Sequence, residues 1–351
     1  MSVDVATRVM RADTAAAAAA ARALAEGGLV AFPTETVYGL GADAANARAV
    51  ARLFAAKDRP SFNPLISHVA DLAQARRLAR FDPAAARLAA AFWPGPLTLV
   101  LPKTDDCPVS ELATAGLDTI AVRMPDHPVA REILAAFAGP VVAPSANRSG
   151  RLSPTSATHV LADLEGRIDL LIDGGPTQVG IESTVVACLD ATAFLLRPGG
   201  LPRSRIEAVL GFELTDPPRA DAGASPAAPG MLGSHYAPKA RLRLEVRAVE
   251  PGEALLAFGP ALASGAEHAA AVLNLSPAGD LVEAAANLFS HLRALDAAGV
   301  ATIAAMPVPH ADIGEAINDR LARAAAPRKQ KSEIRGQQSE RGNRTDPTSR
   351  S

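Results

Sequence analysis

The chain has 351 residues, of which 48% are hydrophobic and 21% are charged, and its formal net charge is -2. The length allows two domains, and this composition is typical of globular proteins that bury a core. The near-neutral charge gives no global electrostatic case for binding nucleic acid.

The first 210 residues alternate between strand and helix patterns. An alanine-rich helix is expected to begin at its N-cap Thr14 and to stop at Gly27. Several late strands follow one another without a helix, which predicts a mixed sheet rather than a parallel one. The other predicted helices span 44–56, 72–78, 83–92 and 127–137, and the predicted strands span 29–32, 65–69, 97–101, 120–123, 141–143, 170–173, 184–189 and 194–197.

The second part of the chain changes character. Residues 212–240 are rich in Pro, Gly, Ala and Ser, as in a linker, but contain the specific sequence PGMLGSHYAP at 229–238. Residues 241–326 predict a smaller three-layer α/β domain, and the polar residues 327–351 predict a disordered tail. Its strands are expected at 255–258, 271–275 and 302–306, and its helices at 281–297 and 313–325.

The two cysteines, Cys107 and Cys188, lie in no CxxC or Cys/His cluster. We therefore expect neither a structural metal site nor a disulfide framework, and a reducing, cytoplasmic location. No stretch is apolar over the roughly 20 residues that a membrane-spanning helix needs.

Four loops beside predicted strands contain the residues suited to chemistry. The first, 32–41, carries two hydroxyls, a carboxylate and a phenol, followed by glycines that would let the backbone approach a ligand. The second, 57–68, begins with Lys57 and Arg59 at a helix end, where basic residues can also simply stabilise the helix dipole. Asn63 lies in an extended segment before a proline, and His68 ends the next strand.

The third loop, 144–155, precedes a helix whose natural N-cap is Thr155 or Ser156. Its hydroxyls and backbone N–H groups would form a phosphate cradle, although no GxxxxGK(S/T) sequence occurs. The fourth loop, 180–186, contains Ser183, and Arg197 ends the following strand.

Lys57, Arg59, Arg123 and Arg197 together supply positive charge with few matching carboxylates. Arginine binds phosphate and carboxylate groups through two parallel hydrogen bonds. No Ser-His-Asp or Cys-His order is present, so covalent catalysis has little support. The residues alone predict a nucleotide-using enzyme with a second, anionic substrate.

The same loops, in the same order, resemble the YrdC-like family of threonylcarbamoyl-AMP synthases over roughly residues 12–210. The linker sequence and the second domain resemble the long, two-domain form of that family. The matching sequences are PTETVYGLG from Pro33, KDRPSFNPL from Lys57, PGPLT from Pro94, AVRMPDHP from Ala121, PSANRSG from Pro144, SPT from Ser153, GIESTVV from Gly180 and LRPG from Leu196.

The resemblance implies an α/β fold, with a YrdC-like twisted mixed sheet followed by a smaller Rossmann-like domain. It implies a catalytic domain at 1–211, a linker with an active-site lid at 212–240, a C-terminal domain at 241–326 and a disordered tail at 327–351. The implied enzyme is a nucleotidyltransferase that condenses L-threonine, bicarbonate and ATP into threonylcarbamoyl-AMP and pyrophosphate. Mg²⁺ would enter with ATP, and the product would pass to a tRNA threonylcarbamoyl transferase complex, with at most weak tRNA contact.

The resemblance also assigns roles to residues by their position in the motifs. Lys57 and Arg59 would be catalytic beside the phosphates. The implied threonine site is Thr34, His68, Arg123 and Ser183. The implied ATP site is Arg59, Asn63, Thr119, Ala143, Ser145, Ser153, Arg197 and Tyr236.

Other readings remain open on the sequence. Leu232, Gly233 and Ser234 replace the basic and aromatic residues that many long-form relatives have there, while His235 and Tyr236 are retained. A double-stranded RNA-binding module without catalysis is the main alternative. A carbamoyl-transfer domain of hydrogenase maturation and an inactive paralogue are further ones.

Overall fold

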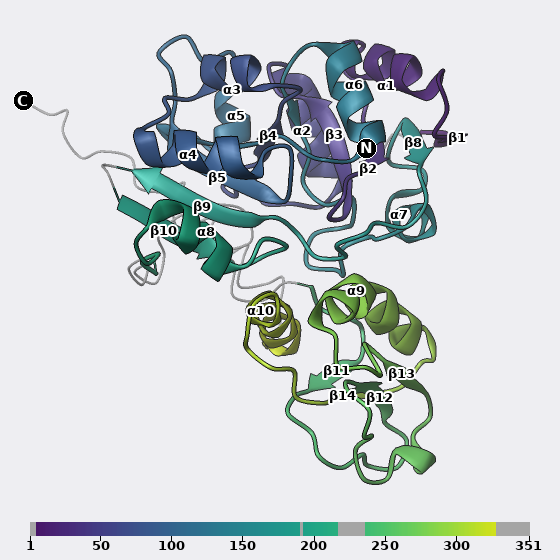
Figure 1. Ribbon diagram of the computed structural model, residues 1–351. Helices are drawn as coiled ribbons and strands as arrows, with labels where there is room; N and C mark the ends of the chain where they lie inside the picture. Colours follow the sequence, from purple (N-terminus) through teal and green to yellow (C-terminus); the bar gives the residue numbers. More distant parts are fainter. Residues whose placement is uncertain (1–4, 190–191, 217–235, 328–351) are drawn as a thin grey trace, which may run out of the picture.

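The computed structural model describes residues 5–189, 192–216 and 236–327 (Figure 1). Most of the predicted lid, including His235, and the predicted disordered tail lie outside the described residues. Within them, the chain forms one large mixed sheet and one small parallel sheet. The expected fold class is therefore confirmed. No helix of the described residues is both long enough and apolar enough to cross a membrane.

The large sheet has ten strands in the order β1-β8-β2-β3-β7-β4-β6-β5-β9-β10. The sheet contains both parallel pairs, such as β4 with β6, and antiparallel pairs, such as β5 with β6. Its strands are β1 (Arg8–Arg11), β2 (Val30–Pro33), β3 (Tyr38–Asp43), β4 (Ile66–His68), β5 (Leu97–Pro102), β6 (Thr119–Arg123), β7 (Val141–Val142), β8 (Leu170–Asp173), β9 (Thr184–Leu189) and β10 (Thr192–Arg197).

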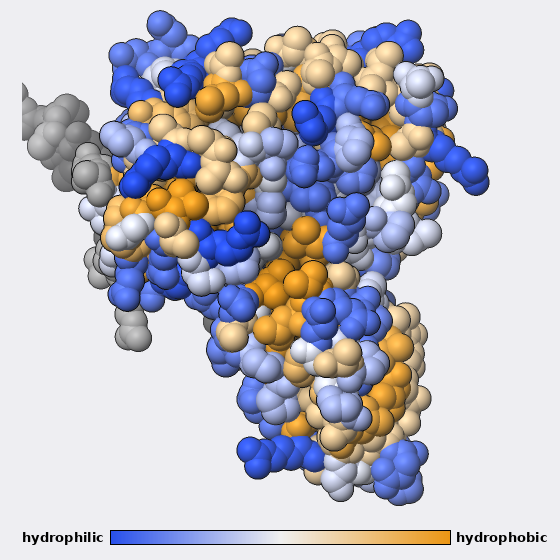
Figure 2. All heavy atoms as spheres, in the orientation of Figure 1, coloured by the Kyte–Doolittle hydropathy of each residue, from blue (hydrophilic) through white to orange (hydrophobic). Residues whose placement is uncertain are grey.

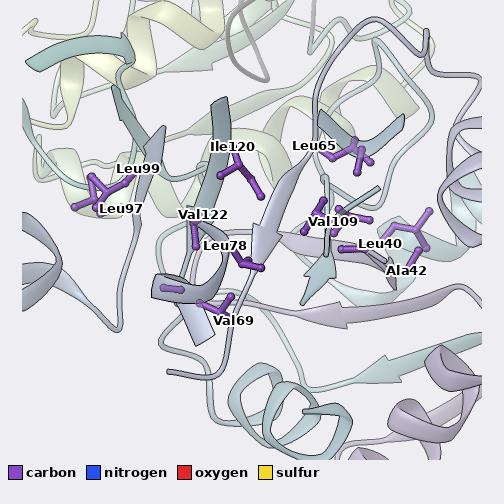
Figure 3. Packing of buried hydrophobic residues seen from close by; sticks show 14 of the residues in the cluster. Leu40, Ala42, Leu65, Val69, Leu78, Leu97, Leu99, Val109, Ile120 and Val122 are labelled. Carbon is purple, nitrogen blue, oxygen red and sulfur yellow. The ribbon is translucent and has the colours of Figure 1, made fainter. Parts of the chain in front are cut away.

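Helices cover the two faces of this sheet unequally. One face carries the largest apolar cluster, in which Leu97, Leu99 and Val122 pack beneath the helices (Figure 3). The helices α1 and α6 cover only one end of the opposite face, against β2, β7 and β8. The helices of the first domain are α1 (Ala16–Ala25), α2 (Ala47–Ala56), α3 (Leu72–Leu78), α4 (Pro83–Phe92), α5 (Glu111–Thr114), α6 (Pro128–Phe137), α7 (Ala157–Leu164) and α8 (Arg203–Leu210).

The first of the four loops is a β-hairpin, which corrects the sequence interpretation. β3 pairs antiparallel with β2, so Gly39 and Gly41 lie inside a strand rather than in an open loop. A Cβ at Gly41 would come within 2.7 Å of the Phe32 ring, so this glycine makes room for an apolar neighbour and not for a ligand. Glycine is depleted in strands, which is why sequence reasoning missed β3.

Local capping explains where the predicted helices begin. The first helix starts at Ala16, two residues after the predicted cap Thr14, because Asp13 Oδ1 accepts the N–H groups of Ala15 and Ala16. The N-cap of α7 is Ser156, one of the two residues expected. Besides β3, the sequence analysis missed β1, α5 and α8 in the first domain and a strand at Arg241–Arg243 in the second.

The second sheet is parallel throughout, in the order β11-β14-β12-β13. The two long helices pack on one of its faces, and the short helix η1 with its neighbouring loops covers the other. Its elements are β11 (Arg241–Arg243), β12 (Ala254–Ala257), η1 (Ala266–His268), β13 (Val272–Asn274), α9 (Leu281–Ala297), β14 (Thr302–Ala305) and α10 (Gly314–Ala325).

The two domains are docked through α9 and α10, which face the first domain (Figure 1). Val37, Leu152 and Ile181 of the first domain belong to the same apolar cluster as Phe289 of α9. Figure 2 shows apolar side chains gathered where the two domains meet. Gly180, with φ of +76°, lies so close to α9 that a Cβ would stand 2.4 Å from the Ala286 Cα. The close contact between the domains therefore depends on the absence of a Cβ atom at Gly180.

Replacing Gly180 with alanine should separate the domains. The left-handed backbone alone costs about 1–2 kcal/mol, and overpacking adds about 1–3 kcal/mol. Gly211→Ala is the matched control, because Gly211 has φ of +77° and open space around its Cβ position. Urea unfolding of the full chain should show a larger loss of stability for Gly180→Ala. Equal losses in the two variants would contradict close packing at this point.

Candidate active site

The candidate site lies on the part of the sheet face that α1 and α6 leave uncovered. There β4, β5 and β6 lie side by side, with His68 opposite Arg123 and Arg123 opposite Thr98. Side chains alternate between the faces of a strand, and these three point to the same face as the apolar patch of Ile66 and Val100. Residues at the same end of three adjacent strands in the middle of the sheet thus meet, and this end of the strands is called the edge of the site below.

Arg123 is the best-anchored cation of this edge. It is only 4% exposed, and its Nη2 donates to Glu35 Oε1 at 2.6 Å and to Thr36 Oγ1 at 3.0 Å. The other Glu35 oxygen accepts the backbone N–H of Asp126. The expectation of few matching carboxylates was wrong here, because Glu35 comes from the hairpin turn, far from Arg123 in sequence. Glu35 thus holds the Arg123 guanidinium in one orientation.

The other expected threonine-site residues lie around this arginine and are buried. Thr34 Oγ1 donates to the Val37 carbonyl at 2.7 Å and so closes the hairpin turn. Ser183 Oγ lies 2.8 Å from Thr98 Oγ1 and accepts from Arg197 Nη2 at 3.2 Å. The structure therefore gives Thr34 a clear structural role, and it places Ser183 between the two candidate substrate regions.

His68 is a neutral side chain in this site. Its ring Nδ1 lies 3.2 Å from the Ile66 carbonyl, and the residue is 1% exposed. Burial, followed by the positive charge of Arg123, lowers the pKa of His68 to about 3. At neutral pH the imidazole can donate and accept hydrogen bonds, but it carries no charge.

Lys57 makes a contact that the sequence did not indicate. Its side chain is 2% exposed, and Nζ donates to the backbone carbonyls of Ser145 and Asn147 in the third loop. Burial, followed by the charge of Arg59, holds the pKa of Lys57 well below its usual value. Its described contacts thus stabilise the conformation of the third loop. Neither the helix-capping interpretation nor the expected phosphate contact had suggested this role.

Arg59 and Asn63 form a compact turn at the start of the second loop. The Arg59 guanidinium donates to the carbonyls of Asn63 and Pro64, and burial lowers the pKa of Arg59 to about 10, so it keeps its charge at neutral pH. The side-chain amide oxygens of Asn63 and Asn147 are buried and have no hydrogen-bond partner among the residues that the structure describes. Buried polar atoms are rarely left unpaired, so two such oxygens near the same loops indicate a place for a ligand or water.

A second polar cluster lies where the fourth loop meets the second domain. Ser153 Oγ donates to Glu182 Oε1, whose other oxygen accepts from Arg320 Nε at 2.8 Å. Arg197 donates to the Ser183 carbonyl at 2.8 Å. Tyr236 is 2% exposed, and its ring lies 5.2 Å from the Arg320 guanidinium. Tyr236 is thus built into the contact between the domains.

The remaining expected residues extend the site along the sheet. Thr119 begins β6 and is half-buried, four residues from Arg123, or about 13 Å along a strand. Ala143 directly follows β7, and its N–H donates to the Ile66 carbonyl at 3.1 Å. Ser145 supplies the carbonyl that Lys57 binds. The structure therefore does not place Thr119 beside Arg123, but at the far end of an elongated site.

Sequence reasoning missed several residues of the site. Glu35 and Glu182 stand inside the quoted motifs but received no role, and Asn147 was not assigned to a substrate. Arg320 gave no signal at all, because an arginine in an amphipathic helix is usually solvated. Only the docking of α10 reveals that Arg320 is 1% exposed.

Comparisons with known proteins match both domains. The family described as "Telomere recombination", Sua5/YciO/YrdC, matches residues 22–199. The family described as "Threonylcarbamoyl-AMP synthase, C-terminal domain" matches residues 201–326.

Similar proteins match along most of the chain. A threonylcarbamoyl-AMP synthase of Bacillus subtilis is 44% identical, covering 89% of this chain and 93% of the relative. One of Pyrococcus abyssi is 45% identical, covering 87% and 93%. The crystal structure of P. abyssi Sua5 complexed with L-threonine superimposes with a TM-score of 0.81 at 41% identity, over 91% of this chain and 97% of that one.

The low pKa of His68 predicts a pH-dependent stability. Between pH 6.5 and pH 3 the unfolded chain binds a proton at this histidine that the folded chain does not, so stability falls as the pH is lowered. From pH 7.5 to pH 5 the loss from His68 should be about 2 kcal/mol. His68→Asn should lose less than the natural chain over this interval, measured by urea unfolding. A loss as large in the variant would mean that His68 is protonated when folded.

Proposed function

Since this chain belongs to the family of two-domain threonylcarbamoyl-AMP synthases, we propose that it condenses L-threonine, bicarbonate and ATP into threonylcarbamoyl-AMP and pyrophosphate. The observation that carries the proposal is the elongated site in which Arg197 lies near Arg59 and is linked through Ser183 and Thr98 to Arg123. The fully matched second domain supports the two-domain form.

The reaction needs positioning more than it needs a nucleophilic side chain. Bicarbonate loses hydroxide to give carbon dioxide, and the neutral amine of threonine forms a C–N bond with its carbon and gives up a proton. The proton and the hydroxide combine to water, and the product is a carbamate. A carbamate oxygen then attacks the α-phosphorus of ATP, and the bond to the β-phosphate breaks to release pyrophosphate. The enzyme is therefore a nucleotidyltransferase, which acts by holding two anions in line and by stabilising the charge that develops.

The edge around Arg123 suits the amino acid. Arg123 uses Nε and Nη2 for protein contacts, and Nη1 makes no hydrogen bond with the described residues, so it can bind the threonine carboxylate. Thr34, neutral His68 and Ser183 surround it with hydrogen-bonding groups. A site of this kind can recognise both the carboxylate and the hydroxyl of threonine.

The loops around Arg59 suit the nucleotide. Arg59 and the Asn63 amide oxygen, which has no hydrogen-bond partner among the described residues, belong to the second loop. Ser145 and Ser153 belong to the third loop, and Arg197 donates to Ser183 of the fourth. Thr119, Ala143 and Tyr236 complete the set assigned to ATP. Lys57 supports this half by holding the third loop. Glu35 and Glu182 are both paired with arginines, so Mg²⁺ would enter bound to the phosphates of ATP.

The burial of these arginines also weighs against the alternative of an RNA-binding module. Arg123 and Arg197 are each 4% exposed, and buried guanidiniums cannot reach the phosphates of a duplex. We propose that the product passes to a tRNA threonylcarbamoyl transferase. That partner, weak tRNA contact and a cytoplasmic location stay predictions.

The purified chain should release pyrophosphate from ATP only when threonine and bicarbonate are both present. Serine should react more slowly, because a missing methyl group in a fitted pocket is worth about 1–3 kcal/mol. The measurement is pyrophosphate release with each amino acid in turn, with and without bicarbonate. Equal release without an amino acid would rule out the proposed reaction.

Arg123→Lys should affect threonine far more than ATP. A lysine ammonium cannot bind Glu35, Thr36 and a carboxylate in the fixed geometry of a guanidinium. The KM for threonine should rise at least roughly tenfold, the scale of one lost charge-assisted hydrogen bond, while the KM for ATP changes little. Arg203→Lys, at a partly exposed ion pair, is the matched control. An equal rise of both KM values would contradict the assignment of Arg123 to the amino-acid site.

A further inference from the structure

Arg320 is the most deeply buried cation of the second domain. It lies on α10, it is 1% exposed, and its guanidinium crosses the domain boundary. Nε donates to Glu182 Oε2 at 2.8 Å, and Nη1 donates to the Pro198 carbonyl at 3.0 Å. Glu182 belongs to the fourth loop and Pro198 follows β10, so both of these partners lie in the first domain. Nη1 also donates to Asp319 of α10 itself, at 2.6 Å. A residue outside the catalytic domain thus contacts the motif that contains Ser183.

Glu182 passes this contact on to the nucleotide loop. One carboxylate oxygen binds Arg320, and the other accepts a hydrogen bond from the hydroxyl of Ser153, which is fully buried. The Glu182 backbone carbonyl also accepts the N–H of Gly200 at 2.9 Å. Arg320 and Ser153 are therefore linked through a single carboxylate, and a shift of one changes the position of the other.

Two further contacts hold the same loop from the second half of the chain. Arg293 on α9 donates to the Leu152 carbonyl and to Asp163 Oδ2 at 2.9 Å. The Ala237 N–H donates to the Gly150 carbonyl at 2.9 Å. Gly150 and Leu152 are thus bound directly by groups beyond residue 235, and Ser153 is reached from Arg320 through Glu182. The second domain therefore holds the end of the third loop, whose beginning is held by Lys57.

An ion pair that only joined the two domains would not need to be buried beside Ser153. Arg203 and Glu315 also join the two domains through α10, but their side chains are 27% and 32% exposed, as is usual for surface pairs of small net effect. Arg320, with no side-chain exposure, pairs with a Glu182 that is 8% exposed. Burying a charged pair is costly. Its presence beside Ser153 therefore indicates that the pair fixes the position of this residue and does not serve mainly to hold the domains together.

We propose that Arg320 is a positioning residue of the nucleotide site, which acts through Glu182 to hold Ser153 and its loop against ATP. The inference rests on the proposed function. The second domain is then part of the active site and not only an appended module. Loss of Arg320 loosens residues 150–153 and weakens ATP binding, while the threonine edge around Arg123 keeps its own contacts.

The test compares two ways of removing the link with one matched control. Arg320→Met leaves Glu182 buried without its partner, and this variant alone is open to misfolding. The double variant Arg320→Met/Glu182→Gln removes both charges and keeps an acceptor for Ser153. Glu315→Gln breaks the ion pair that joins the same helix to Arg203 of the first domain and serves as the control. The readouts are KM for ATP and for threonine, ATP binding by calorimetry, thermal unfolding, and hydrogen exchange of residues 148–155.

The double variant should unfold near the temperature of the Glu315→Gln variant, raise the KM and Kd for ATP at least fivefold, and exchange faster at residues 150–153. The KM for threonine should rise by a smaller factor. A folded double variant with the ATP binding and the exchange of the control would overturn the inference. If the natural chain releases no threonine-dependent pyrophosphate, the proposed reaction fails, while the exchange data still decide whether Arg320 holds the loop.

Discussion

Burying a positive charge is costly unless its hydrogen bonds are satisfied, and this chain does so repeatedly in one region. Lys57, Arg123, Arg197 and Arg320 are all at most 4% exposed. Lys57, Arg123 and Arg320 bind segments at least 88 positions away in the sequence, and Arg197 binds Ser183, 14 positions away. Each therefore fixes a tertiary contact. The loops of the site hold their shape because these cations require partners.

The kind of hydrogen-bond partner decides whether the charge of each cation is balanced within the protein. Arg123 and Arg320 bind the carboxylates of Glu35 and Glu182, which fix their geometry and balance their charge. Lys57 and Arg59 donate instead to backbone carbonyls, which satisfy hydrogen bonds without neutralising a charge. The region around Arg59 therefore keeps an excess of positive potential. An anion such as a triphosphate is the ligand that such a region favours.

The docking of the second domain is the other feature that follows from these cations. Gly180 allows α9 to approach the fourth loop, and this approach brings Arg320 of α10 onto Glu182. Tyr236, at the end of the linker, lies against both Phe289 and Arg320. Close packing and the buried ion pair thus support each other at a single interface. A change in either would be transmitted to Ser153 through Glu182.

The sequence by itself determined the local elements, because strand and helix periodicity and capping act over a few neighbouring residues. It predicted α3 and α4 with their observed bounds and the mixed character of the sheet. Its ordered motifs also identified the family and the loops of the site. It could not show that Glu35 faces Arg123, that Lys57 holds the third loop, or that Arg320 is buried. These contacts join residues that are 88 or more positions apart, so only the tertiary structure decides them.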